Sequence, residues 1–254
     1  MTGISIQNLW KAFPNAESRD ELLVAVQDVS LEIKEREFVC VLGPSGCGKS
    51  TLLRVAAGLE KPSSGSVTTQ SRPSVVFQEH GIFPWLTIAE NVAYPLKLRG
   101  VPRAERRTRV TELLELVGLQ DFASYYPAQI SGGMRQRTSV ARALADDGDV
   151  LLMDEPFGAL DEQTRVVLQQ ELLRIWEQTS KSVLFITHSV DEALTLADRV
   201  VVMSHRPGRI IDEIEIPFGR PRDIKELRRD PRYGEITVKL WELLEQRPEE
   251  ESAA

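Results

Sequence analysis

The chain has 254 residues, of which 42% are hydrophobic and 27% are charged, and its formal net charge is −7. This composition is that of a folded protein with a hydrophobic core and argues against a disordered chain. The net negative charge argues against a sequence-independent nucleic-acid binder, which needs clustered Lys and Arg.

Four short apolar runs predict buried strands, and helical patterns stand between them. The strand runs are 38–42, 150–153, 183–187 and 200–203, and the helical patterns are 51–57, 108–117 and 164–176. Runs of this kind, rich in Val, Ile, Leu and Phe, are typical of a parallel sheet that is covered on both faces. Strands that alternate with helices predict an α/β fold.

The stretch from about 82 to 145 is different, because its pattern is mostly helical and contains no convincing strand. Thr87-Ile88-Ala89-Glu90 has the form of a capping box and predicts the start of a helix. We therefore expect one domain over 1–254, with a helical subdomain at about 82–145 inserted into the α/β core. A C-terminal extension is expected over about 205–254, and its acidic tail at 248–254 is expected to be disordered.

A Gly-rich loop follows the first apolar run and opens a helix. Its sequence is Gly43-Pro44-Ser45-Gly46-Cys47-Gly48-Lys49-Ser50-Thr51, a complete match to the phosphate loop (Walker A). The glycines let backbone amides face an anion, and the helix N-terminus adds its dipole. Lys49 can then reach the β- and γ-phosphates of ATP, and the Ser50 hydroxyl can ligate Mg²⁺. Cys47 and Cys40 are expected to be free thiols, with a redox switch at Cys47 as the weaker alternative.

Two acids, Asp154 and Glu155, follow the apolar run 150–153. Ligands bind at the C-terminal ends of strands in open α/β sheets. Asp154 is placed to hold Mg²⁺, mostly through water, and Glu155 is placed to polarise the attacking water. Taken alone, this pattern fits a strand that ends in solvent equally well, but downstream of a phosphate loop it indicates a hydrolytic site.

A third motif, Ile130-Ser131-Gly132-Gly133-Met134-Arg135-Gln136-Arg137, resembles the signature of the ABC (ATP-binding cassette) superfamily, commonly Leu-Ser-Gly-Gly-Gln. Ser131 and the amides of Gly132 and Gly133 stand at a helix start, where an anion can bind unobstructed. The resemblance implies a P-loop NTPase of the ABC nucleotide-binding type, with an N-terminal antiparallel β subdomain and with ATP and Mg²⁺ as cofactors. In that family the signature binds the γ-phosphate held by the other subunit.

Further elements of this family follow in the expected order. The resemblance implies that Gln78 senses Mg²⁺ and the attacking water, and that His188 contacts the γ-phosphate. It also implies that Ala159-Leu160-Asp161 crosses a dimer interface. Phe13 matches the aromatic residue, usually Tyr, that stacks on adenine. Trp10 is a competing candidate for this role, and a purely core role for Phe13 also stays open.

Two short segments concern the local backbone. Ser189-Val190-Asp191-Glu192 has the form of a capping box, which places His188 just before a helix. Glu35-Arg36-Glu37 departs from the family pattern, which usually has Gly before the last Glu. This departure affects a turn ahead of a strand, and we expect it to leave activity intact.

Other phosphate-loop proteins fit the sequence less well. ATPases of the RecA and AAA types lack the Ser-Gly-Gly signature, DNA-repair ABC proteins insert a long coiled coil before it, and translation-factor ABC proteins carry two cassettes. A single cassette must dimerise, because each ATP needs one subunit's phosphate loop and the other's signature. The expected partner is a second nucleotide-binding subunit, most simply an identical copy.

Two segments resemble the nitrate, sulfonate and taurine importers. They are His80-Gly81-Ile82-Phe83-Pro84-Trp85-Leu86-Thr87, and Arg206-Pro207-Gly208-Arg209-Ile210 followed by Arg220-Pro221-Arg222. The resemblance implies an ATPase subunit that energises the import of a small anion such as nitrate, a sulfonate or taurine. In such importers the region of Phe83-Pro84-Trp85 helps to form a groove for a permease coupling helix. Packing of these residues inside the helical subdomain is the open alternative.

The expected partners are membrane permease subunits and, indirectly, a periplasmic or extracellular substrate-binding protein. No apolar run approaches the roughly 18–20 residues that span a bilayer, and the N-terminus lacks a signal-peptide pattern. We therefore expect attachment through the permease to the cytoplasmic face of the cell membrane. The alternative is an ABC ATPase with a regulatory or scaffold role outside transport. A catalytically dead cassette is disfavoured, because Lys49, Asp154, Glu155 and His188 are all present.

Overall fold

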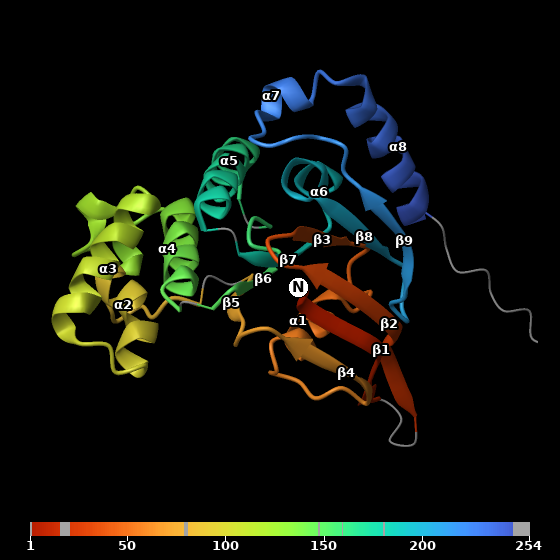
Figure 1. Ribbon diagram of the computed structural model, residues 1–254, viewed down its shortest axis with the longest axis horizontal. Helices are drawn as coiled ribbons and strands as arrows, with labels where there is room; N and C mark the ends of the chain where they lie inside the picture. Colours follow the sequence, from red (N-terminus) through yellow and green to blue (C-terminus); the bar gives the residue numbers. More distant parts are fainter. Residues whose placement is uncertain are drawn as a thin grey trace, which may run out of the picture.

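The computed structural model describes residues 2–15, 21–78, 81–146, 148–158, 160–179 and 181–245. Two sheets form the body of this part of the chain, with helices around and beside them (Figure 1). Three features predicted from the sequence lie outside the described residues: His80, Ala159 and the tail at 248–254.

The N-terminal sheet has three antiparallel strands in the order β2 (Leu22–Lys34), β1 (Thr2–Pro14) and β4 (Ser64–Thr69). In the second half of β2, Val29, Leu31 and Ile33 are buried, whereas the residues between them are exposed. Such alternation places one face of an antiparallel sheet on a core and the other in water. The expected N-terminal antiparallel sheet is thereby confirmed.

The second sheet has the order β5-β6-β7-β3-β8-β9, and all its pairs are parallel except β8–β9. Its strands are β5 (Ser74–Val76), β6 (Val150–Asp154), β7 (Ser182–Thr187), β3 (Phe38–Leu42), β8 (Arg199–Met203) and β9 (Ile210–Glu215). Every residue of β3, β6 and β7 is buried, as expected for strands covered on both faces. The four predicted strands are present, and the three that follow Phe38–Leu42 are each one residue longer than predicted.

Alternate residues of β3 serve two separate cores. Val39 and Val41 belong to a cluster with the N-terminal sheet and with α1 (Lys49–Ala56). Phe38, Cys40 and Leu42 belong to the cluster on the opposite face. Figure 1 shows that face covered by α5 (Glu162–Thr179), α6 (Val190–Leu196) and α8 (Pro231–Glu245). The central strand therefore holds the two layers together, and the phosphate loop begins directly at its end.

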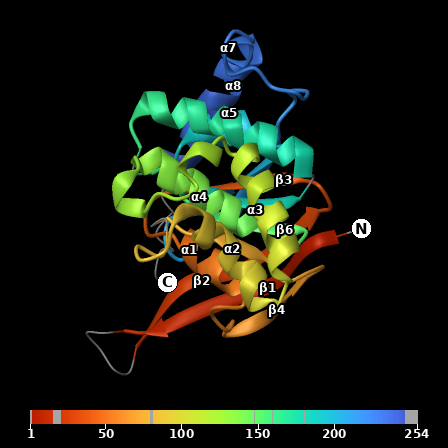
Figure 2. The same ribbon diagram turned by 90° about the vertical axis from the view of Figure 1, so that its left-hand side faces the viewer.

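Between β5 and β6 the chain forms α2 (Ile88–Leu98), α3 (Arg103–Leu116) and α4 (Gly132–Leu144), with short 3₁₀ turns at Gln120–Phe122 and Pro127–Gln129. Figure 2 shows these helices grouped in front of the sheets. The predicted capping box forms at α2, because Thr87 Oγ1 accepts from Glu90 N and Glu90 Oε2 accepts from Thr87 N. Helix α3 begins five residues before the predicted 108, since its first turn is charged and shows no apolar period.

The C-terminal part of the chain returns over the helical face. After β9 it forms the single turn α7 (Ile224–Leu227) and then α8, which packs on α6 and β8. No described helix is both long and apolar enough to cross a membrane.

Candidate functional site

The phosphate loop connects β3 to α1, and its glycines take positions that side chains could not. Gly46 and Gly48 have φ of 76° and 106°, in the left-handed region. A Cβ on Gly48 would also lie 2.4 Å from the carbonyl oxygen of Ala25. Lys49 Nζ donates to the carbonyls of Gly43 and Pro44 at 2.7 and 2.8 Å. A third, longer contact of this ammonium is with Cys47 Sγ at 4.0 Å.

The two cysteines near this loop are buried and unpaired, as predicted. Burial raises the pKa of the Cys40 thiol well above its ordinary value, and it raises the pKa of Cys47 as well. Since the thiolate is the reactive form, both sites disfavour redox chemistry.

Ser50 and Asp154 form a pair of oxygen donors where α1 meets the end of β6. The Ser50 hydroxyl donates to Asp154 Oδ1 at 2.9 Å, and Asp154 is only 6% exposed. Burial raises the pKa of Asp154, against the opposing effect of the Ser50 hydrogen bond. No group of three or more His, Cys, Asp or Glu residues in the described ranges could hold a metal. One hydroxyl and one carboxylate do fit Mg²⁺, which takes its other ligands from water and phosphate.

Glu155 stands at the junction of the site in an unusual backbone conformation. Its φ is 41°, and its amide donates to the carbonyl of Ile186 at 3.0 Å. Such backbone strain in a residue other than glycine is typical of functional sites. Its Oε2 lies 3.1 Å from His188 Nδ1, and its Oε1 lies 3.9 Å from Lys49 Nζ.

Gln78 joins the same group of side chains from the end of β5. A Cβ built on Gly158 would lie 3.9 Å from Gln78 Nε2 and 3.8 Å from Glu155 Oε2. The structure therefore brings together four side chains, one from the start of α1 and three from separate loops, which we call the hydrolysis cluster. Its members are Lys49, Gln78, Glu155 and His188.

The loop that carries His188 differs in part from the prediction. Ser189 is the N-cap of α6, and its hydroxyl accepts from Glu192 N at 3.4 Å. The second half of the predicted capping box is wrong, because the Glu192 carboxylate accepts from Thr187 Oγ1 at 2.5 Å instead. Glu192 is buried, and its Oε1 lies 3.7 Å from Arg165 Nε. Its carboxylate therefore contacts Thr187 and Arg165 and does not accept from the backbone of Ser189. Burial raises the pKa of Glu192.

The Ser-Gly-Gly motif forms a second group at the start of α4. Ser131 caps this helix by accepting from Met134 N at 3.3 Å, and Gly132 and Gly133 form the first turn. A Cβ on Gly133 would lie 3.1 Å from Thr164 Cγ2, so the motif packs on the start of α5. Ser131 and Gly133 line a pocket of about 360 Å³ there.

Asp161 belongs to this second group. Its Oδ1 accepts from Thr164 N at 3.0 Å, and its hydrogen bonds with Thr164 lower the pKa of Asp161. The candidate phosphate-binding residues therefore divide into the hydrolysis cluster with the phosphate loop, and a signature group made of Ser131, Gly132, Gly133 and Asp161.

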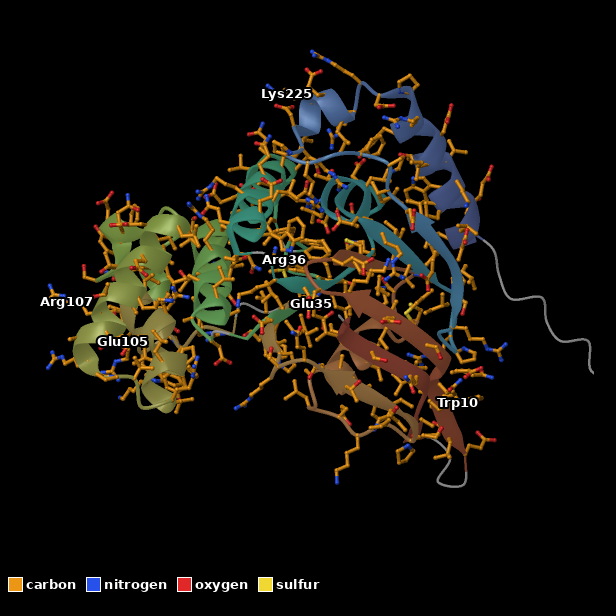
Figure 3. The ribbon with its side chains drawn as sticks, viewed as in Figure 1. Trp10, Glu35, Arg36, Glu105, Arg107 and Lys225 are labelled. Atoms are coloured by element: carbon orange, nitrogen blue, oxygen red, sulfur yellow. The ribbon has the colours of Figure 1, made fainter. Side chains whose placement is uncertain are left out.

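Both aromatic candidates for adenine stacking lie on β1. Phe13 is half-buried against the N-terminal core, and the Lys11 ammonium lies 4.6 Å from the centre of its ring. Trp10 is also half-buried, and its carbonyl accepts from Ser63 N. β1 is the central strand of the N-terminal sheet, and Figure 3 shows Trp10 on this strand. Phe13 thus combines a core contact with a partly open ring.

The segment 206–208, known from the sequence only as part of an importer-like pattern, contacts the phosphate loop directly. Arg206 Nε donates to the carbonyl of Gly46 at 3.1 Å. A Cβ on Gly208 would lie 2.1 Å from the carbonyl oxygen of Cys47, so this position requires glycine. The Arg-Pro-Gly pattern was visible in the sequence, but its contact across 160 residues was not.

Comparisons with known proteins agree with this geometry. Residues 26–158 match the family described as ABC transporter. The chain is 43% identical to the taurine import ATP-binding protein TauB of Roseobacter denitrificans, with 97% of each chain covered. It is 45% identical to the nitrate import ATP-binding protein NrtD of Synechococcus elongatus, over 88% of this chain and 86% of the relative.

A solved structure shares the fold as well. It is the dimeric ATP-binding cassette MJ0796 in a post-hydrolysis state bound to ADP and Pi. The TM-score is 0.74 at 32% identity, over 85% of this chain and all of that chain. The match confirms the α/β cassette fold expected from the signature. The chain therefore belongs to the ABC transporter family, and it is an ATP-binding cassette that hydrolyses ATP.

Proposed function

We propose that two copies of this chain bind Mg-ATP and hydrolyse it to drive the import of a small anion such as nitrate, a sulfonate or taurine. The observation that carries the proposal is the hydrolysis cluster, in which Glu155 lies between Lys49 and His188. A carboxylate held between a cation and an imidazole, beside a phosphate loop, is suited to orienting water for attack on a phosphoryl group.

The residues act in the following roles. The amides of the phosphate loop and Lys49 bind the β- and γ-phosphates, while Ser50, Asp154 and Gln78 would hold Mg²⁺. The ion, when bound, neutralises charge on the phosphate oxygens. Glu155 orients a water molecule and accepts its proton as the water oxygen bonds to the γ-phosphorus. The bond from that phosphorus to the bridging oxygen breaks, which leaves ADP and phosphate. His188 contacts the γ-phosphate, and its contact with Glu155 keeps both side chains in place.

The signature group supports a paired arrangement. Ser131 and Gly133 line a pocket with Thr164 of α5, rather than with residues of the phosphate loop. We propose that Ser131, Gly132, Gly133 and Asp161 complete the site on a second copy, and that Phe13 stacks on the adenine. The dimeric form of the related cassette MJ0796 supports this reading.

An exposed aromatic patch supports a docking site for the permease. Trp85 is 70% exposed, which argues against packing inside the proposed helical subdomain. Its ring centroid lies 5.6 Å from that of Phe83, which in turn packs on Tyr94 at 4.7 Å. Phe83 and Tyr94 line a groove of about 510 Å³ together with Leu98. An aromatic anchor beside an apolar groove suits a helix from a membrane subunit, which would hold the chain at the cytoplasmic face.

The solute is proposed from the named relatives, because the chain itself is proposed to touch only nucleotide and permease. TauB is named for taurine import and NrtD for nitrate import, and both cover most of this chain. What these two solutes share is a small oxyanion group, which is nitrate itself in one and the sulfonate of taurine in the other.

The test is a tagged purification from gently solubilised native membranes, with the co-purifying chains identified by mass spectrometry. We expect a permease and a substrate-binding protein in stoichiometric amounts. Titrating that binding protein with nitrate, taurine and an alkanesulfonate then names the solute. Recovery of soluble partners alone would contradict the transport role and favour a regulatory one.

A further inference from the structure

Helix α6 begins two residues after His188, so whatever holds this helix also sets the position of the imidazole. The helix has only seven residues, Val190–Leu196, and all of them except Asp191 are buried. A helix this short is not stable by itself and depends on its packing. Figure 1 shows it enclosed by α5, α8 and the sheet.

Two arginines of the C-terminal segment cap the end of α6. Arg222 donates from Nη1 to the carbonyls of Thr195 and Ala197, at 3.1 and 2.7 Å. Arg220 donates from Nη2 to the carbonyl between them, that of Leu196, at 2.6 Å. The last carbonyls of a helix have no partner within it, and cations are favoured at that end by the helix dipole. Three consecutive carbonyls are therefore satisfied from a segment about 25 residues further along the chain.

These arginines are built into the fold and are not surface charges. The Arg222 side chain is 1% exposed, and burial lowers the pKa of its guanidinium to about 10. Arg220 pairs with Asp198 at 2.8 Å, and its guanidinium lies 4.1 Å from the centre of the Trp176 ring. A buried cation is retained only where hydrogen bonds offset its desolvation. The capping contacts are therefore strong constraints on the end of α6.

The same C-terminal segment also holds the beginning of α6. Tyr233 of α8 donates from its hydroxyl to Asp191 Oδ1 at 2.6 Å. Arg228 Nη2 lies 3.8 Å from the other oxygen of that carboxylate. Both ends of α6 are thus fastened by residues between 220 and 233.

We propose that Arg220 and Arg222 are positioning residues for ATP hydrolysis, because their caps on α6 hold His188 against Glu155. The inference rests on the role proposed for His188, and it assigns a task to the Arg-Pro-Arg motif that the nucleotide site leaves without one. Because α6 is short and is held at both ends, a displacement of the helix is expected to move His188, which precedes it by two residues. A shift of about 1 Å at reacting groups is enough to lower turnover by up to about a hundredfold.

The first measurement is the steady-state ATPase activity of the full chain. Arg220→Met keeps a long side chain beside Trp176 but removes the cap and the pair with Asp198. Arg222→Lys keeps the buried charge with fewer donors. We expect kcat to fall about tenfold in each, with the KM for ATP within about twofold, because the phosphate loop and Lys49, which supply most of the proposed contacts with ATP, are unchanged. Tyr233→Phe should give a smaller loss of the same kind. Arg229→Met is the matched control, since Arg229 of the same segment is highly exposed and pairs only with Glu226 in the described contacts.

The second measurement follows His188 itself. The chain has three histidines, so its imidazole NMR signals can be assigned with single substitutions. We expect the His188 signal to shift or broaden in Arg220→Met and Tyr233→Phe and to stay unchanged in Arg229→Met. This readout does not depend on activity, and Arg220→Met and Tyr233→Phe suffice for the test if Arg222→Lys fails to fold.

Two outcomes separate this inference from the proposed function. If His188→Ala loses turnover but Arg220→Met changes neither kcat nor the His188 signal, the positioning role is wrong and the site assignment stands. If His188→Ala keeps normal turnover, the role proposed for His188 fails and this inference fails with it. A lower kcat in Arg220→Met with an unmoved His188 signal would also overturn the proposal.

Discussion

The hydrolysis cluster and the signature group are both candidate phosphate-binding sites, but they are built in opposite ways. The hydrolysis cluster converges from the start of α1 and three loops of one chain, and it includes polar side chains in contact, such as Glu155 with His188 and Lys49. The signature group consists mainly of backbone amides at the start of α4, and it packs on α5. We propose that the first acts on a phosphate bound within its own chain, whereas the second offers its amides to a phosphate held by another copy.

The two groups differ because they depend on different structural support. Side chains that are poised for chemistry need fixed neighbours, and the sheet supplies them because β3, β6 and β7 end side by side. Free amides at a helix start need only an anion in front of them, and a second molecule can bring that anion. In the pair that we propose, association of the two copies depends on the nucleotide, so binding of ATP can be converted into movement.

The largest effect is expected from Glu155→Gln. Removing the carboxylate charge should lower ATP turnover by about a hundredfold to ten-thousandfold, the range for loss of a general base. Binding of ATP should persist, because Lys49 and the loop amides are untouched, and the ATP-bound protein should run as a dimer on a sizing column. Turnover measured with Mg-ATP at saturation checks this. A near-normal rate would contradict the role given to the hydrolysis cluster.

Mixing two inactive variants tests whether the two groups act across a dimer. Lys49→Ala disables the phosphate loop, and Gly132→Asp places a carboxylate in front of the signature amides. The position of Gly132 has room for a side chain, since the nearest atoms to an added Cβ lie at 3.8 and 3.9 Å. Mixed pairs would contain one intact site.

The mixture should regain about a quarter of the wild-type rate, because half of the random pairs are mixed and each has one working site of two. The control is each variant alone at the same total concentration, which should stay inactive. An inactive mixture, with mixed pairs shown by differential tags, would mean that the signature group serves its own chain.

Arg206→Met tests a smaller contribution to the phosphate-loop side of the comparison. Its hydrogen bond to the Gly46 carbonyl should contribute about 1 kcal/mol to holding the loop, so the Kd for ATP should rise by about fivefold. Binding of a fluorescent ATP analogue measures this. Arg209→Met is the matched control, because Arg209 lies in the same turn, is exposed, and uses only its backbone in the described hydrogen bonds. An equal loss of ATP affinity in both variants would show that the positive charge of the turn, and not the hydrogen bond from Arg206 to Gly46, is responsible.

The sequence predicted the strands and the phosphate loop well, because both depend on local patterns. The residue types of the run at Phe38–Leu42 and of the glycines after it indicate their backbone conformation, although the strand itself pairs with the distant strands β7 and β8. The capping box at Ser189 was half wrong for the opposite reason. Glu192 has the right spacing, but Thr187 and Arg165 compete for its carboxylate, and only the folded chain brings Arg165 there.

The contacts of the C-terminal arginines escaped prediction for the same reason. Arg206 and Arg222 stand in recognisable motifs, yet the atoms that they bind are backbone carbonyls of Gly46, Thr195 and Ala197. Every residue has a backbone carbonyl, whatever its side chain, so a pattern of residue types cannot indicate which carbonyl an arginine binds.

The smallest effect concerns backbone strain, which occurs both at the hydrolysis cluster and far from it. Glu155 has φ of 41° and Arg36 has φ of 59°, but Arg36 lies in the exposed turn before β3, at the end of the strand away from the phosphate loop (Figure 3). A residue other than glycine in the left-handed region destabilises the folded protein by about 1–2 kcal/mol. Replacing it with glycine removes this strain, but the greater freedom of glycine in the unfolded chain costs about 0.5–1 kcal/mol. Arg36→Gly should therefore stabilise the protein by about 0.5–1 kcal/mol, seen as a melting temperature higher by about 1–4 °C, with unchanged ATPase activity. Arg36→Ala keeps the strain and should show no such gain, so an equal rise in both variants would assign the effect to the lost charge instead. Strain at Arg36 is then dispensable, whereas strain at Glu155 accompanies the geometry that we propose for turnover.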